Sequence, residues 1–412
     1  MPASPDARRP SRTPRLQVER LDIRLAPSAS AAPRVQPVYP NDPGFSSQWG
    51  LDDGGGFDVD APEAWRVTTG SRATIIAVLD SGIDLKNPEF RGRLWVNPSA
   101  SRPGRPVYGW NFVREDGNVQ DDYGHGTHVA GVLGAAAGNR RGIAGLDWNA
   151  RIMVLKIFDA HGNGEPEAAA AAVRFAVDHG ARIINASWAT DEYSQALYDA
   201  VAYAAARGVV LVTGAGNRAA DLDAAPVYPA SFDLPNILVA TAVDRSGGLA
   251  DFASYGAATV DVGAPGVDVY STYASRSRFA TLSGTSMAVS FATGVVSLVA
   301  GLHPDWSAER LIQHVEACVR PLPGLVGKTS TGGMVDAARA VGAGDPGRGG
   351  VVPTASPGRP RPPVPRWVRP SPTPPLRPAV VRGDSGVLET SMSAGSLRKA
   401  PSIALPRFGG PG

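Results

Sequence analysis

The chain has 412 residues, 43% of them hydrophobic, which is enough for one large domain with extensions or for two to three average domains. Its net charge of +2 is unevenly spread: residues 1–36 carry +4 and residues 343–412 carry +7, so the middle carries −9, which argues against a body that binds nucleic acid. The single cysteine, Cys318, excludes an internal disulfide framework and a cysteine-based metal site, and no apolar run approaches the length of a membrane span.

Both ends of the chain differ in composition from its middle. Residues 1–38 are rich in Pro, Ser, Ala and Arg and are predicted to form a disordered N-terminal segment. No apolar stretch follows Arg8 and Arg9, so no signal peptide is visible. Residues 343–412 hold fifteen of the chain's 37 prolines among Gly, Ser and Arg, which predicts a disordered tail. A folded body is therefore expected over residues 39–342.

The middle of the chain alternates between apolar strands and helices. The run at 73–79 is continuously apolar and ends at Asp80, as in a strand that is buried on both faces. Further strands are predicted at 152–158, 182–188, 209–213, 237–243 and 259–262. Helices are predicted at 125–137, 167–179, 194–207 and 307–319, and in the apolar run that follows Ser286. This alternation predicts an α/β fold, with a doubly wound, mostly parallel sheet and helices on both faces.

Four polar residues fall where strands end or helices begin. Asp80 and Asn217 each follow a predicted strand, and His125 and Ser286 each open a helix. Because sites in open α/β sheets gather outside the carboxyl ends of the strands, these side chains are expected to meet. A serine becomes a nucleophile when a histidine takes its proton and a buried carboxylate orients that histidine. The chain order Asp, His, Ser is one known arrangement of such a triad, and Asn217 offers an amide donor to an oxyanion.

The segments around these residues resemble those of the subtilisin-like serine endopeptidases, the subtilases, and in particular their thermitase branch. They read DSGID at 80–84, HGTHVAG at 125–131, GN at 216–217 and GTSMA at 284–288. The resemblance covers residues 39–342, which would form a subtilisin-like peptidase domain. It implies hydrolysis of peptide bonds through an acyl-enzyme, with Asp80, His125 and Ser286 as the triad and Asn217 as the oxyanion donor.

The resemblance also implies where a peptide substrate would bind. Family members pair an extended substrate with two strand segments, so that main-chain hydrogen bonds hold the peptide. The corresponding residues here are Gly162, Gly164, Glu165, Ser187, Trp188 and Ala189. The primary specificity pocket would be formed by Gly214, Ala215, Gly216 and Ala230. Since Ala189 and Ala230 stand where glycine is common, we predict a narrower pocket that disfavours large aromatic side chains.

Calcium is the cofactor that the resemblance implies, in a structural role. Ca²⁺ prefers six to eight oxygen ligands from carboxylates, amides and carbonyls. The strong site of the family would be formed here by Asp42, Glu89, Asn139, Arg141 and Ile143, the last two through their carbonyls. A second site would be formed by Asp116, Asn118 and Gln120. The alternative interpretation of each loop is a polar surface loop without an ion.

Two departures from the family pattern keep other functions open. Ser290 stands where the motif usually continues with proline in the first helical turn, and a displaced Ser286 would let an amine compete with water, as in a transpeptidase or macrocyclase. Residues 1–38 are a disordered segment or the remnant of a propeptide. Missing propeptide material is the support for a second alternative, a catalytically inactive binding protein, although the intact triad and Asn217 argue against it. By resemblance, we expect polypeptide partners, a monomer and a secreted location.

Overall fold

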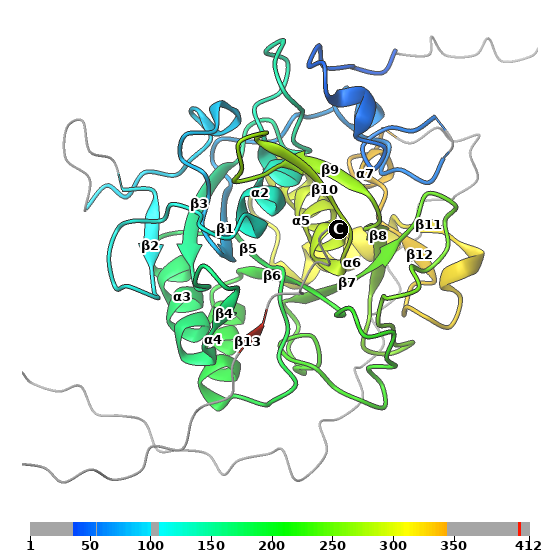
Figure 1. Ribbon diagram of the computed structural model, residues 1–412. Helices are drawn as coiled ribbons and strands as arrows, with labels where there is room; N and C mark the ends of the chain where they lie inside the picture. Colours follow the sequence, from blue (N-terminus) through cyan, green and yellow to red (C-terminus); the bar gives the residue numbers. More distant parts are fainter. Residues whose placement is uncertain (1–35, 55, 100–106, 344–402, 405–412) are drawn as a thin grey trace, which may run out of the picture. The chain divides into compact units, whose positions relative to one another are not determined.

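The computed structural model describes residues 36–54, 56–99, 107–343 and 403–404. The disorder predicted for the two tails therefore concerns residues that lie almost entirely outside the described ones. Within the described residues, the central element is a nine-stranded sheet (Figure 1). In spatial order its strands are β11 (Arg320–Pro321), β12 (Gly333–Met334), β8 (Val262–Pro265), β7 (Ile237–Val243), β6 (Val210–Gly214), β5 (Ile183–Ala186), β1 (Ile75–Asp80), β3 (Arg151–Lys156) and β2 (Gly109–Asn111).

The order of the strands places the carboxyl end of β1 at a topological switch point. All neighbouring strands pair in parallel except β11 and β12. From β1 the chain adds β3 and β2 on one side, and it then returns to add β5, β6, β7 and β8 on the other. Adjacent connections diverge at such a point, which leaves a crevice above the strand ends. Asp80, the last residue of β1, lies there.

Helices cover both faces of the sheet. One face packs against α2 (His125–Gly134) and α5 (Thr285–Leu302), and the other packs against α3 (Pro166–Asp178) and α4 (Gln195–Ala205). Side chains of β1 alternate between the two cores: Ile76 and Val78 belong to the first, and Ala77 and Leu79 to the second. This period of two is expected for a strand that is buried on both sides. The predicted doubly wound α/β fold is confirmed.

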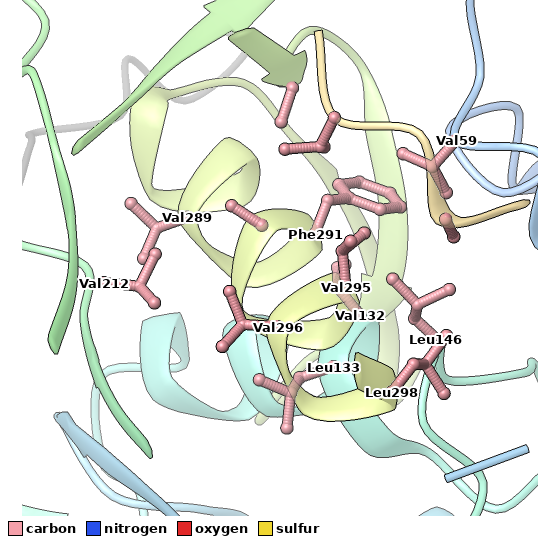
Figure 2. Close-up of a cluster of buried hydrophobic side chains, with 14 of the residues drawn as sticks. Val59, Val132, Leu133, Leu146, Val212, Val289, Phe291, Val295, Val296 and Leu298 are labelled. Atoms are coloured by element: carbon pink, nitrogen blue, oxygen red, sulfur yellow. The ribbon is translucent and has the colours of Figure 1, made fainter. Parts of the chain in front are cut away.

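Helix α5 is the centre of the first core. Figure 2 shows Val295, Val296 and Leu298 of this helix packed beside Val132 and Leu133 of α2. By length and composition α5 would suffice to cross a membrane, so the prediction that no apolar run approaches that length was wrong. Most of this apolar segment, 89%, is buried inside the fold, so its hydropathy reflects its position in the core.

The remaining elements are short. They are the helices α1 (Ala61–Ala64), α6 (Ala308–Ala317) and α7 (Ala337–Ala340), the 3₁₀ turns η1 (Phe45–Ser47), η2 (Pro88–Phe90) and η3 (Pro323–Leu325), the hairpin of β9 (Val269–Thr272) and β10 (Phe279–Leu282), and the pair β4 (Asn163–Gly164) and β13 (Ile403–Ala404). The β9–β10 hairpin lies on α2, where the hydroxyl of Ser271 donates to the carbonyl of His128 at 2.8 Å. None of the two-residue strands was predicted, because periodicity cannot be read from so few residues.

All the predicted strands except the one at 237–243 begin or end one to three residues away from their predicted limits. The strand expected at 259–262 begins only at Val262, because the N–H of Thr259 donates to the carboxylate of Asp223 and Val260 continues that turn. The strand expected at 182–188 ends at Ala186. Trp188 lies beyond it, and its indole N–H donates to the carbonyl of Leu79 at 3.0 Å.

Candidate active site

Asp80 and His125 meet at the switch point. Asp80 ends β1, His125 begins α2, and both side chains are buried. Nδ1 of His125 lies 2.8 and 2.9 Å from the two carboxylate oxygens of Asp80. Gly126 permits this approach, because a Cβ at that position would lie only 2.3 Å from the carbonyl oxygen of Gly82. A carboxylate so placed holds the proton on Nδ1 and so makes Nε2 the proton acceptor of the neutral ring.

Asp121 joins the first turn of α2 to the loop that follows β1. Its Oδ1 accepts hydrogen bonds from the hydroxyl of Ser81 at 2.9 Å and from the N–H of Gly124 at 2.8 Å. Its Oδ2 accepts from both the N–H and the hydroxyl of Thr127. Asp121 was not predicted as a site residue, although an acidic side chain just before a predicted helix start is a recognisable capping signal. Asp121 therefore fixes the elements that carry Asp80 and His125.

His128, the second histidine of the same motif, is held away from this pair. Its Nε2 lies 3.0 Å from the carbonyl of Val269 in the β9–β10 hairpin, so this nitrogen carries the proton. Burial, followed by the nearby His125, lowers the pKa of His128 to about 3. The His128 side chain is therefore neutral, and its hydrogen bond to Val269 joins α2 to the β9–β10 hairpin.

Ser286 is the second residue of α5, and it is held in place by Ser187, which follows β5, and by Asn185 of β5. Its hydroxyl donates to the carbonyl of Ser187 at 3.0 Å, and the hydroxyl of Ser187 donates to the carbonyl of Ser286 at 3.2 Å. Asn185 in turn donates to the Ser187 hydroxyl at 2.9 Å. Ser187, predicted as a substrate contact, thus also positions Ser286.

Ser290 lies further along α5 than the sequence suggested. It is the sixth residue of the helix, beyond the first turn in which a proline would be tolerated. Its hydroxyl donates to the carbonyl of Ser286 at 3.0 Å, and α5 continues through it without interruption. The departure from proline therefore adds a hydrogen bond behind Ser286.

The side chain of Asn217 is oriented by the first residue of α5. Its Oδ1 accepts from the N–H of Thr285 at 2.9 Å and from the Thr285 hydroxyl at 3.0 Å. Because a main-chain N–H can only donate, this contact identifies the oxygen of the amide and places its NH₂ group on the opposite side. Asn217 and Ser286 line the same cavity.

That cavity has a volume of about 600 Å³ and lies between strands β5 and β6 and the start of α5. Six of the predicted substrate residues line it: Ser187, Trp188, Ala189, Gly214, Ala215 and Gly216. Ala230, predicted for the same pocket, does not line it; its side chain is fully buried in the core on the α3–α4 face. Gly162, Gly164 and Glu165 lie on or beside β4 instead, where Glu165 is exposed.

The far wall of the cavity was not predicted. It consists of Asp191, Arg218, Ala220, Ala225, Pro226, Val227, Phe252, Ser254 and Ser283. These residues come from loops whose sequence carries no motif. Most of them are apolar, and Arg218 and Asp191 form an exposed ion pair.

Comparison with known proteins identifies this arrangement. A profile described as the subtilase family matches residues 71–344, about two thirds of the chain. The chain belongs to the subtilase family. It is a serine endopeptidase, as the sequence analysis predicted, and its similarity to thermitase is shown by the relatives that follow.

Three similar proteins illustrate the extent of the match. Thermitase of Thermoactinomyces vulgaris is 36% identical over 306 residues, which cover 73% of this chain and 99% of thermitase. A thermophilic serine proteinase of Bacillus sp. (strain AK1) is 39% identical over 237 residues, 58% of this chain and 54% of that protein. The solved structure of a protease from Pseudoalteromonas arctica superposes with a TM-score of 0.65 at 26% identity, covering 74% of this chain and 99% of that one.

The predicted strong calcium site of this subtilase has two facing carboxylates. Asp42 accepts hydrogen bonds from the N–H groups of Gly138 at 2.6 Å and Asn139 at 3.0 Å. Glu89 is buried, and its Oε2 accepts no hydrogen bond from any described residue. Burial, followed by the charge of Asp42, raises the pKa of Glu89 to about 7, against a lowering contribution from the N–H of Ile143. An orphaned carboxylate oxygen beside a second carboxylate fits a cation.

The predicted second calcium loop is folded by its own polar groups. Asp116 accepts from the N–H of Asn118 at 2.9 Å, and Asn118 accepts from that of Gln120 at 3.3 Å. Gln120 bridges to Leu85 and Asp84. Among the described residues, no group of three or more His, Cys, Asp or Glu side chains could hold a metal ion, so an ion in either loop would need amide and carbonyl oxygens in addition to the carboxylates.

Proposed function

We propose that Ser286 is the nucleophile, His125 the general base and Asp80 the carboxylate that orients it. The observation that carries this proposal is the contact of both Asp80 oxygens with Nδ1 of His125, which leaves Nε2 to take a proton. Ser286 attacks the carbonyl carbon of the scissile peptide bond while its proton passes to His125. His125 then gives that proton to the departing amine, and water releases the acyl group by the reverse sequence.

We propose that two donors stabilise the oxyanion that forms in each step. One is the NH₂ group of Asn217, which is preset by the hydrogen bonds of its oxygen to Thr285. The other is the N–H of Ser286 itself, since the first N–H groups of a helix have no partner within the helix. Donors fixed before the reaction need no reorganisation when charge develops.

We propose that the substrate is an extended polypeptide lying between β4 and residues 187–189. The cavity beside Ser286 would receive the side chain that precedes the scissile bond. Its far wall is formed largely by small and apolar residues, among them Ala220, Pro226 and Val227. We expect apolar side chains of moderate size to be preferred, with aromatic ones disfavoured.

We propose that one structural Ca²⁺ is bound by Asp42, Glu89, Asn139 and the carbonyls of Arg141 and Ile143. The buried, unpartnered Oε2 of Glu89 supports this proposal. The ion would neutralise the two carboxylates and take no part in the reaction. A second ion at Asp116, Asn118 and Gln120, a secreted location and a monomeric state rest on the resemblance alone.

The proposal is tested by the reaction of the intact chain with a fluorophosphonate. One adduct on the parent chain and none on Ser286→Ala would support an activated Ser286, and Ser290→Ala is the matched control for loss of a neighbouring hydroxyl. Absence of an adduct on a folded parent chain would refute the triad. Product masses in the presence of an added amine would show whether water or the amine takes the acyl group, which separates an endopeptidase from a transpeptidase.

A further inference from the structure

A short strand beside the active site carries a distant segment of the same chain. β4 lies outside the nine-stranded sheet, and its partner among the described residues is β13. The two strands are antiparallel, with Ile403 opposite Gly164 and Ala404 opposite Asn163. Figure 1 shows β13, in red, against β4. A segment near the carboxyl end of the chain thus adds a strand to β4.

The turn that precedes β4 decides which of its groups face outward. The N–H of Asn163 donates to the carboxylate of Asp159 at 2.9 Å, and its carbonyl accepts from the N–H of Asp159 at 2.9 Å. Both main-chain groups of Asn163 are therefore directed inward. Since the direction of these groups alternates along a strand, Gly164 presents its N–H and carbonyl to the outside, toward Ile403. Ile403 is accordingly the residue whose main chain bonds to β4.

β13 runs along β4 in the direction that a peptide substrate would have to take to reach the triad. Its carboxyl-terminal residue, Ala404, lies opposite Asn163, on the side of β4 that leads to Gly162. Gly162 abuts the ring of Tyr123, where a Cβ on the glycine would come within 3.0 Å. Tyr123 precedes His125 by two residues. The strand therefore points its carboxyl end toward the triad, as the acyl part of a bound peptide does.

The connection to the body allows this pairing within one molecule. Fifty-nine residues lie between Ala343, the last described residue of the body, and Ile403. A chain can span at most about 3.3–3.6 Å per residue, so a connection of this length can extend to roughly 200 Å. Chain length therefore does not prevent Ile403 from pairing with β4 of the same molecule.

We propose that Ile403–Ala404 occupies the β4 part of the substrate cleft, so that the carboxyl-terminal segment of the chain competes with peptide substrates. This inference rests on the proposed function in one respect, namely that β4 binds substrate. It adds a partner for that surface, which is a segment of the chain itself. Main-chain hydrogen bonds hold a strand against β4 whatever its side chains, so Ile403–Ala404 would compete with substrates of any sequence.

The test compares four chains with a chromogenic tetrapeptide substrate. They are the full chain, a chain that lacks residues 401–412, the full chain with Ile403→Pro, which removes the N–H that faces Gly164, and the full chain with Ala394→Pro as the matched control. We expect the truncated chain and Ile403→Pro to show an apparent KM at least three-fold lower than the full chain, with kcat unchanged. Ala394→Pro should behave as the full chain. Equal KM values in all four chains would overturn the inference.

A binding experiment tests the same pairing without a measurement of activity. A fluorescent peptide with the sequence of residues 399–408 is added to the Ser286→Ala chain with and without residues 401–412. We expect the peptide to bind saturably to the truncated chain and at least three-fold more weakly to the full chain. A peptide with proline at the Ile403 position should not bind to either chain. Absence of binding to the truncated chain would refute the inference even if the triad reacts normally. An apparent KM that rises with enzyme concentration would assign the strand to a second copy and overturn the intramolecular pairing.

Discussion

The hydroxyl of Ser81 and the carboxylate of Asp121, 40 positions apart in the chain, are joined by a hydrogen bond of 2.9 Å. Ser81 follows Asp80 directly, and Asp121 also holds the first turn of the helix that begins with His125. The geometry of the Asp80–His125 pair therefore depends on a second carboxylate, that of Asp121, which holds together the segments that carry the two residues.

We expect Asp121→Asn to reduce both stability and turnover. In Asp121→Asn an NH₂ group replaces one of the carboxylate oxygens that accept hydrogen bonds. A buried donor that loses its acceptor costs about 1–3 kcal/mol of stability. We expect kcat to fall roughly ten-fold with little change in KM, because a displaced His125 would be less often in the geometry that the reaction needs. Urea denaturation and peptide kinetics measure the two effects. Asp199→Asn, the same change on the exposed face of α4, should alter neither, and an unchanged kcat for Asp121→Asn would contradict the positioning role.

Asn217→Ala should lower kcat by about 10²–10³ and leave KM nearly unchanged, because the lost donor acts on the oxyanion. Thr285→Val removes the hydroxyl that helps to orient the Asn217 oxygen but keeps the main-chain N–H. We expect a smaller loss, about three- to ten-fold in kcat. Steady-state kinetics with one peptide substrate compares the variants. A rise in KM at constant kcat for Asn217→Ala would instead assign this residue to substrate binding.

The sequence was sufficient where local pattern and chemistry agree. The apolar run before Asp80 predicted a buried strand, and the small residues after His125 predicted a helix. Contacts between distant segments were not predictable. The position of Asp121 before a helix signals a cap, but its contact with Ser81 is shown only by the structure. The far wall of the cavity comes from loops without periodicity. Ala230 was assigned by alignment of a motif, but side-chain direction beyond a loop cannot be read from spacing, and it points into the core.

Removal of calcium should destabilise the chain if Asp42 and Glu89 share an ion. An ion present at 100 times its Kd stabilises the folded state by about 2.7 kcal/mol, or roughly 5–10 °C in Tm. The measurement is thermal unfolding of Ser286→Ala, which prevents autolysis, with added Ca²⁺ or chelator. Glu89→Gln should abolish most of the difference, whereas Glu165→Gln, an exposed carboxylate outside both loops, should retain it. The same Tm with ion and chelator would contradict the proposed site.

His128 should make the stability of the fold depend on pH below neutrality. Its pKa is about 3 in the folded chain and about 6.5 when unfolded. Between these values only the unfolded state binds the proton, so the free energy of unfolding falls as pH falls, by up to about 1.4 kcal/mol per unit. His128→Gln keeps a donor for the carbonyl of Val269 but cannot titrate. Urea denaturation of the two chains in the Ser286→Ala background, from pH 7 to pH 4, should give a slope that is smaller for His128→Gln by about one proton. Equal slopes would mean that His128 is protonated within the folded protein, and burial would then not exclude the charged ring.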